Sequence, residues 1–187
     1  MAQDAARNYQ IKITLRDSKP PIWRRVLVPS NITLAMLHHV IQRVMGWEDY
    51  HLHQFIVGEL YYGAPDPDYD DFMEVHDERE VRLDQIVRGE GFKFVYEYDF
   101  GDSWEHILLV EKILPPEPGQ QVPVCIKGKR ACPPEDVGGV WGYDSFLEAI
   151  QNPEHPQHAD YREWIGGAFD PEAFDLEAVN EALRSLR

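Results

Sequence analysis

The chain has 187 residues, a formal net charge of −15 and 43% hydrophobic residues, which is enough apolar material for a packed core. The sequence holds no apolar run near the ~20 residues of a membrane-spanning helix, and its two cysteines exclude a disulfide scaffold. Because the N-terminus shows no basic-then-apolar signal segment, we expect a cytoplasmic protein with no membrane partner. The negative charge repels a phosphate backbone and argues against nucleic acid as a partner.

The first third of the chain predicts a hairpin followed by a helix. Residues 9–16 alternate apolar and polar side chains, as a half-buried strand does, and residues 22–28 predict its antiparallel partner. Apolar residues then recur at helical spacing over 34–45, where Thr33 is a suitable N-cap and Gly46 a suitable C-terminal end. This strand–strand–helix order predicts a β-grasp-like start to the domain.

The middle of the chain predicts further strands. Residues 52–62 favour a strand or a hairpin, and residues 81–87 favour a short strand or one helical turn. Aromatic residues alternate with other residues over 92–100, which is the strongest strand signal in the chain, and 104–114 predicts the next strand. The acidic stretch 64–80 predicts an exposed loop.

The C-terminal third predicts helices. Four prolines in 115–123 indicate an irregular loop, and helical patterns follow over 145–151, 158–165 and 176–186. The predicted fold class is therefore α+β: an antiparallel sheet that starts with a β-hairpin and a helix, with the C-terminal helices closing the core. We see no domain boundary and expect residues 7–187 to form a single domain.

The segment YDFGDSWEH at 98–106 joins the two strongest strands through a turn. A two-residue loop places His106 opposite Glu97 or Asp99, on one face of the sheet, whereas a three-residue loop places it opposite Tyr98. A carboxylate beside an imidazole favours its protonation or orients it as a metal ligand. The alternative is that glycine and aspartate only make the turn and that His106 lies on the surface.

A second unusual segment, ACPPEDVGG at 131–139, precedes a tryptophan. Two prolines stiffen the chain, and two glycines permit unusual dihedral angles or close approach of another group. Two adjacent carboxylates stand between them, which is how a site is often built and also how a tight buried turn is made. The residues concerned are Cys132, Glu135, Asp136, Gly138, Gly139 and Trp141.

A third segment contains the pair His51 and His53. At this spacing on a strand, both imidazoles share a face, and such pairs bind zinc or iron. The alternative is ordinary packing or surface exposure. A divalent metal is thus an open question, and the candidate ligands are His51, His53, Asp99, His106, Glu135 and Asp136.

We predict that the 98–106 tip packs against segment 131–143, with Trp104 or Trp141 between them. A bare tip with three aromatic residues would expose a large apolar patch. Crowded carboxylates then need a cation, and His106, Arg130 or a bound metal could supply it. The predicted binding surface comprises Asp99, Asp102, Trp104, His106, Cys132, Glu135, Asp136, Gly138, Gly139 and Trp141.

Five segments occur in one order along the chain: IWRR at 22–25, MGW at 45–47, HLHQF at 51–55, YDFGDSWEH at 98–106 and ACPPEDVGG at 131–139. Together they resemble the plasmid pRiA-type open-reading-frame-three-like family, whose members also appear as "TnpR" passenger proteins of insertion elements. The resemblance implies an α+β domain carried by plasmids, mobile elements and chromosomes, and it implies no biochemical activity. Nothing in the sequence resembles a serine or tyrosine recombinase, although the "TnpR" label suggests a resolvase.

The commoner form of this family has a second cysteine at the position of Val137, so the resemblance gives Cys132 no cysteine partner within its own loop. The leading hypothesis is a non-enzymatic binding module with an unknown protein or small-molecule partner. The first alternative is a metal-dependent hydrolase or nuclease-like enzyme that uses the candidate ligands with Asp102. The second is weak nucleic-acid binding through the basic N-terminal strands, with Lys12, Arg16, Arg24 and Arg25.

Overall fold

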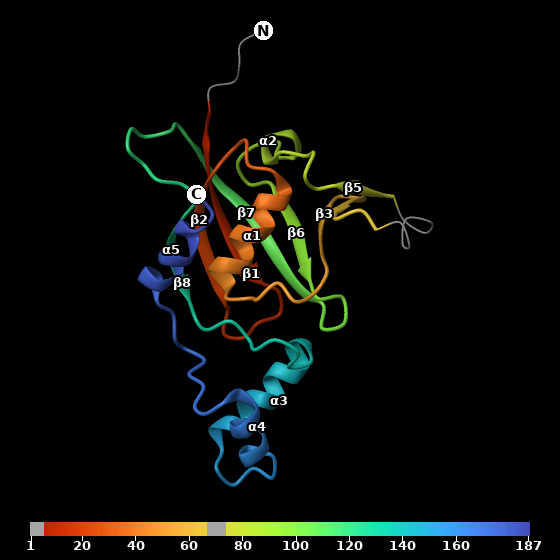
Figure 1. The fold of residues 1–187 in the computed structure, drawn as a ribbon, viewed down its shortest axis with the longest axis vertical. Coiled ribbons are helices and arrows are strands. Elements are labelled where there is room, and N and C mark those ends of the chain that lie inside the picture. The colour runs from red at the N-terminus through yellow and green to blue at the C-terminus, as the bar shows by residue number, and fades with distance from the viewer. Residues whose placement is uncertain (1–5, 67–73) are drawn as a thin grey trace.

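The computed structural model of the chain describes residues 6–66 and 74–187 (Figure 1). Residues 67–73 of the predicted acidic loop lie outside this described part. The strands are β1 (Asn8–Leu15), β2 (Trp23–Pro29), β3 (His53–Val57), β4 (Leu60–Gly63), β5 (Val75–Asp77), β6 (Lys93–Tyr98), β7 (Trp104–Leu114) and β8 (Val124–Lys129). The helices are α1 (Leu34–Met45), α2 (Leu83–Ile86), α3 (Gly139–Gln151), α4 (His158–Ile165) and α5 (Leu176–Arg184).

The described strands form one eight-stranded sheet in the order β5-β4-β3-β6-β7-β1-β2-β8. Its neighbouring strands are antiparallel except for β4 and β5, which are parallel, so the sheet is mixed. The α+β class is therefore confirmed, whereas the prediction of a wholly antiparallel sheet was wrong at the edge formed by β4 and β5. The β1–β2 hairpin is present as predicted, and the β-grasp-like start stays a prediction.

Helix α1 covers one face of the sheet (Figure 1) because the strands below it alternate as the sequence predicts. Tyr9, Ile11, Ile13 and Leu15 of β1 are buried on this face together with the apolar stripe of α1. Thr33 caps the helix through the Met36 N–H, and Gly46 ends it in the left-handed region, both of which agree with the prediction.

Arg24 holds the C-terminal end of α1 on the sheet. Its side chain is buried and donates hydrogen bonds to the backbone carbonyls of Val44 at 2.6 Å and Lys129 at 2.9 Å, while the Phe174 ring lies 4.5 Å from the guanidinium carbon. A cation at this end complements the helix dipole. The role in nucleic-acid contact that the sequence suggested for Arg24 was wrong, because the residue is internal.

The C-terminal helices take two places. Helix α5 packs against α1 and β8, which closes the core at that edge as expected. Helices α3 and α4 instead lie beyond the lower end of the sheet in Figure 1, where the Phe146 ring meets the rings of Tyr161 and Phe169. No helix in the two described ranges is both long and apolar enough to cross a bilayer.

Candidate functional site

Three segments from distant parts of the sequence meet at the end of the sheet where α3 begins (Figure 1): the connection after α1, the tip between β6 and β7, and the segment before α3. The Gly138 N–H donates to Asp102 Oδ2 at 3.0 Å, and the Tyr98 hydroxyl donates to Glu135 Oε1 at 3.1 Å. The Glu48 N–H donates to the same Glu135 oxygen at 2.8 Å. The contact that the sequence predicts between the tip and the 131–143 segment is therefore present.

The tip is longer than predicted. Tyr98 pairs with Trp104, so five residues, 99–103, form the connection. Asp99 and Ser103 have φ angles of 59° and 55°, and the Ser103 N–H donates to the Asp99 carbonyl at 2.6 Å, which closes the wider turn. Both predicted loop lengths were therefore wrong, and His106 faces Tyr96 instead.

His106 is a core residue rather than a site residue. It is fully buried, its Nε2 accepts the Trp47 indole N–H at 3.2 Å, and its Nδ1 lies 3.2 Å from the Tyr96 carbonyl oxygen. Because indole N–H is only a donor, the hydrogen-bond pattern assigns the ring proton to Nδ1. Burial lowers the pKa of His106 to about 4. Its predicted role beside the carboxylates was therefore wrong.

The carboxylates gather around His51. Its Nε2 lies 2.8 Å from Asp136 Oδ1, 3.5 Å from Asp99 Oδ2 and 3.9 Å from Glu135 Oε2. We call these four residues the His51 cluster. Within the described residues, no lysine or arginine forms an ion pair with any member of the cluster. Arg130, the predicted cationic neighbour, instead pairs with Glu172.

Asp99 and Glu135 are the less exposed carboxylates of the cluster, and each has one oxygen held by hydrogen bonds from the protein. Asp99 Oδ1 accepts the Gly101 N–H at 3.0 Å, and Glu135 Oε1 accepts the Tyr98 and Glu48 donors described above. Burial raises the pKa of Tyr98, which keeps its phenol protonated and able to donate. By contrast, His51 Nε2 and Glu135 Oε2 are buried and make no hydrogen bond, although His51 Nε2 lies within ion-pair distance of all three carboxylates.

His53 belongs to a different group. Its Nε2 lies 2.8 Å from Glu78 Oε2, and its ring stacks on His38 with centroids 3.5 Å apart. His51 precedes β3 and turns toward Asp99 and Asp136, so the two imidazoles of the H-x-H segment do not share a site. The predicted pairing of these histidines as common ligands was therefore wrong.

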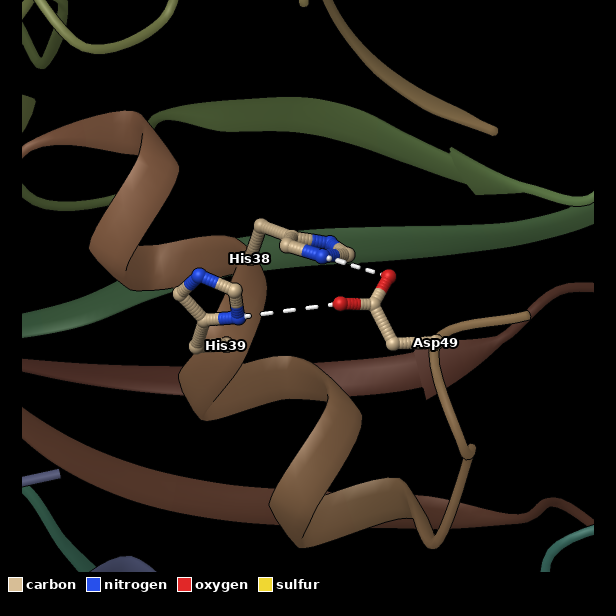
Figure 2. Close-up of side chains that lie close together, drawn as sticks. All are labelled: His38, His39 and Asp49. Atoms are coloured by element: carbon tan, nitrogen blue, oxygen red, sulfur yellow. Dashed lines mark hydrogen bonds and ion pairs between the residues drawn. The ribbon is translucent and has the colours of Figure 1, made fainter. Parts of the chain in front are cut away.

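A second histidine–carboxylate set, which we call the His38 group, comprises His38, His39 and Asp49 (Figure 2). Both histidines lie on α1, and Asp49 follows the helix. Asp49 Oδ1 is 3.0 Å from His38 Nε2, and Asp49 Oδ2 is 3.9 Å from His39 Nδ1. This set resembles a two-histidine, one-carboxylate metal site in its composition.

In the His38 group, both ring nitrogens of the buried histidine nevertheless form hydrogen bonds. Gln42 donates to the Tyr96 hydroxyl at 2.9 Å, because its other amide atom accepts the Asp49 N–H at 2.8 Å. The Tyr96 proton therefore goes to His38 Nδ1 at 2.7 Å, and His38 Nε2–H donates to Asp49. The His38 nitrogens have no free lone pair in this arrangement, so we interpret the group as structural.

The glycine pair permits the close approach that the sequence predicts. A Cβ atom on Gly139 would stand 2.6 Å from the Asp102 carbonyl oxygen, and Gly139 has a φ angle of 70°. Gly139 also begins α3, six residues before the predicted helix start, so the segment ends in a helix rather than a long loop.

The aromatic residues and the cysteine differ from the prediction. Trp141 is 85% exposed and does not lie between the two segments. Trp104 is fully buried in the core, with its ring centroid 5.3 Å from that of Trp47. Cys132 is half-buried, and burial raises the pKa of its thiol, which disfavours a thiolate nucleophile or ligand.

Large apolar side chains on the three segments that carry the cluster are exposed. The residues on either side of His51 and the residue after Asp99 are exposed, as is the tryptophan two positions after Gly139. Their exposed fractions are 67% for Tyr50, 55% for Leu52, 49% for Phe100 and 85% for Trp141. The sequence analysis placed Leu52 and Phe100 inside its motifs and Trp141 just after one, and it did not single out Tyr50. Exposure depends on the tertiary contacts and could not be predicted from the sequence.

Comparisons with known proteins place the chain in a family. Residues 7–178 match the family described as "Plasmid pRiA4b ORF-3-like protein". The protein named "Uncharacterized protein y4hQ" from Sinorhizobium fredii is 40% identical over 179 residues, which cover 95% of this chain and 91% of that protein.

A solved structure is also similar over nearly the whole length. It is the crystal structure titled "Protein of Unknown Function MM3350" from Methanosarcina mazei Go1, with 39% identity and a TM-score of 0.81. The match covers 92% of this chain and 97% of that chain. The family match and the identity to both relatives agree with the sequence motifs, and the chain therefore belongs to the plasmid pRiA4b ORF-3-like family.

Proposed function

We propose that the protein is a non-enzymatic binding module that recognises a cationic segment of a partner protein. One observation carries the proposal: exposed Tyr50, Leu52, Phe100 and Trp141 lie on the three segments that hydrogen bonds hold together around the His51 cluster. Exposed apolar side chains that gather at one place on a protein mark interaction sites. We call this surface the recognition face.

The charge of the recognition face indicates the chemistry of the partner. Carboxylates accompany the exposed apolar side chains on all three segments. A pocket of about 690 Å³ beside Trp141 has an acidic excess in its lining, with the carboxylates of Asp17, Asp102, Glu105 and Asp144 against the cations of Arg16 and Lys19. Lysine and arginine side chains are attracted both to carboxylates and to the faces of aromatic rings. A partner segment rich in arginine and lysine therefore complements this surface.

The other hypotheses have less support. For hydrolysis, the pocket beside Trp141 has no lining residue from the His51 cluster, so this pocket does not place a substrate against those groups. For nucleic acid, Arg24 is buried, Arg25 pairs with Glu111 at 2.7 Å and Arg16 pairs with Glu105. We also propose that residues 7–187 act as one domain, because one apolar core includes residues from β1 to α5. Carriage on a transposable element and a cytoplasmic location stay predictions.

The test measures binding of a fluorescein-labelled peptide rich in arginine and lysine by fluorescence anisotropy. We expect Trp141→Ala to weaken binding by at least about tenfold, the effect of losing a contact worth about 1.4 kcal/mol. Trp164→Ala is the matched control, because Trp164 is an exposed tryptophan on α4, outside the recognition face.

If both tryptophan variants bind the peptide equally well, the attraction is only that of a general acidic surface, and the proposal is wrong. The same conclusion follows if the native protein does not bind the peptide at low ionic strength, where attraction between opposite charges is strongest.

A further inference from the structure

We infer that the His51 cluster binds one divalent transition-metal ion, of the Zn²⁺ or Mn²⁺ class, through His51 Nε2 and the carboxylates of Asp99 and Asp136, with Glu135 as the fourth ligand. The inference goes beyond the proposed binding function and does not depend on it. A mixed set of one imidazole and three carboxylates suits these ions better than Ca²⁺ or Mg²⁺, which prefer oxygen ligands alone.

The donor atoms of His51, Asp99 and Asp136 lie close to the spacing of a coordination shell. Zinc ligands lie at about 2.1 Å from the ion, so neighbouring ligands at tetrahedral or octahedral angles are about 3.0–3.4 Å apart. The Asp136, Asp99 and Glu135 oxygens lie 2.8, 3.5 and 3.9 Å from His51 Nε2. His51, Asp99 and Asp136 also place ligand atoms within 4.8 Å of one another. These three residues therefore hold their ligand atoms close enough to meet at one ion, whereas Glu135, which lies outside this group, becomes the fourth ligand only after its carboxylate moves toward the other oxygens.

The hydrogen bonds around the cluster orient the ligands. On Asp99 and on Glu135, one oxygen accepts backbone or phenol hydrogen bonds and the other faces His51. The Asp99 side chain is only 10% exposed, and within the described chain its Oδ2 accepts no hydrogen bond. In metal sites, hydrogen bonds from surrounding residues hold one oxygen of a ligating carboxylate and leave the other oxygen free to bind the ion.

The atoms that face the centre of the cluster are not satisfied by hydrogen bonds within the described residues. His51 Nε2 and Glu135 Oε2 are buried from solvent and make no hydrogen bond, although buried polar atoms are almost always paired. Three carboxylates around them have no lysine or arginine ion pair in the described part of the chain. A divalent cation would pair both atoms and offset most of this negative charge at once.

The test uses protein purified without a histidine tag and freed of metal with a chelator. We expect isothermal titration with Zn²⁺, and separately with Mn²⁺, to show one ion for each chain. Asp99→Asn and Asp136→Asn should each weaken binding by at least ~10-fold, since each removes one charged ligand and keeps the shape of the side chain.

Asp49→Asn is the matched control because it alters the His38 group in the same way. Asp102→Asn is a second control from the same tip, because its remaining oxygen can still accept the Gly138 N–H. Both control variants should bind Zn²⁺ with the affinity of the native protein. Asp136 is the more exposed ligand, so Asp136→Asn keeps the test valid if Asp99→Asn fails to fold.

Nuclear magnetic resonance of the histidine side chains supplies an independent measurement. Zn²⁺ should shift the ring nitrogen signals of His51 and leave those of His38 unchanged. Binding well below one ion for each chain, or equal loss of affinity in Asp99→Asn and Asp49→Asn, would overturn the inference. Peptide binding is measured separately in chelator, so a failure of the metal site leaves the proposed recognition face to be judged by its own experiment.

Discussion

The His38 group and the His51 cluster contain the same kinds of side chain but differ in their hydrogen bonding. In the first, the Tyr96 hydroxyl, which Gln42 orients, donates to one ring nitrogen of the buried histidine, and Asp49 accepts from the other. In the second, a histidine nitrogen and a carboxylate oxygen are buried and make no hydrogen bond, with only ion-pair contacts inside the cluster. Residue composition therefore does not distinguish a structural network from a ligand site, whereas a count of satisfied atoms does.

The two regions also differ in how the chain assembles them. The His38 group lies on α1 and the residues just after it, so one short piece of sequence contains it. The His51 cluster needs three segments, and it depends on the close approach of Gly139 to Asp102. A site built from distant segments cannot be recognised from the spacing within any one of them.

The largest expected effect is a loss of stability in acid that arises from the buried histidines. Burial lowers the pKa of His38 from 6.5 to about 2 and that of His106 to about 4. Because both folded-state values are below the unfolded value, the unfolded chain binds more protons in this range, and stability falls as the pH drops below about 6.5. The loss is on the order of 1 kcal/mol for each pH unit and each histidine, and the His106 contribution is complete near pH 4.

Urea unfolding between pH 7 and pH 4 measures this acid effect. Replacing His106 with glutamine should reduce the slope of stability against pH more than replacing the half-buried His155 does. An equal slope in both variants would show that other groups cause the acid unfolding.

The next effect tests whether the His38 group is fully hydrogen-bonded. Tyr96→Phe removes the hydroxyl that accepts from Gln42 and donates to His38. Two buried polar groups then lack a partner, so we expect a loss of about 2–5 kcal/mol in the free energy of unfolding. Urea unfolding measures it, with Tyr61→Phe on β4 as control, because the Tyr61 hydroxyl makes no hydrogen bond in the described residues. A Tyr96→Phe loss no larger than the control would contradict the hydrogen-bond network.

The sequence predicted the elements whose periodicity is local. The β1–β2 hairpin, α1 with its Thr33 cap and the β6–β7 pair follow from alternation and capping residues, because burial of one face forces those patterns. The sequence analysis did not predict β8, because Gly128 and the preceding prolines interrupt the strand pattern. It also did not predict β5, which is only three residues long. Pairing with β2 and β4 forms these strands, so tertiary contact decides them.

For the site, the sequence predicted the contact between the tip and the 131–143 segment. It named His51, His53 and His106 as candidate metal ligands but placed only His106 on the binding surface. Asp99, Glu135 and Asp136 were identified because acids beside glycines are conspicuous. His106 was preferred over His51 because the turn length sets the register, and the left-handed residues Asp99 and Ser103 lengthen the turn. Such dihedral angles carry only a weak sequence signal, since aspartate adopts them without glycine.

The smallest expected effect is a change in stability that has opposite signs in the two regions. Asp136 and Asp49 have φ angles of 59° and 58°, so replacing either with asparagine, which tolerates this region, has a similar effect on the backbone. In metal-free protein, Asp136→Asn removes one of three crowded charges and also the 2.8 Å ion-pair contact with His51 Nε2. We expect the relief of repulsion to prevail and stability to rise by up to about 1 kcal/mol. Asp49→Asn weakens a hydrogen bond from His38 and should lower stability by about 1 kcal/mol.

Thermal unfolding of both variants with and without Zn²⁺ completes the comparison. An ion that binds only the folded state raises the stability of the native protein and of Asp49→Asn by an amount that grows with the logarithm of its affinity. In Asp136→Asn the ion binds weakly, so the advantage of this variant in chelator should become a deficit in saturating Zn²⁺. If Asp136→Asn is destabilised in chelator by as much as Asp49→Asn, the His51 carboxylates are not under mutual repulsion, and the distinction between the two groups is wrong.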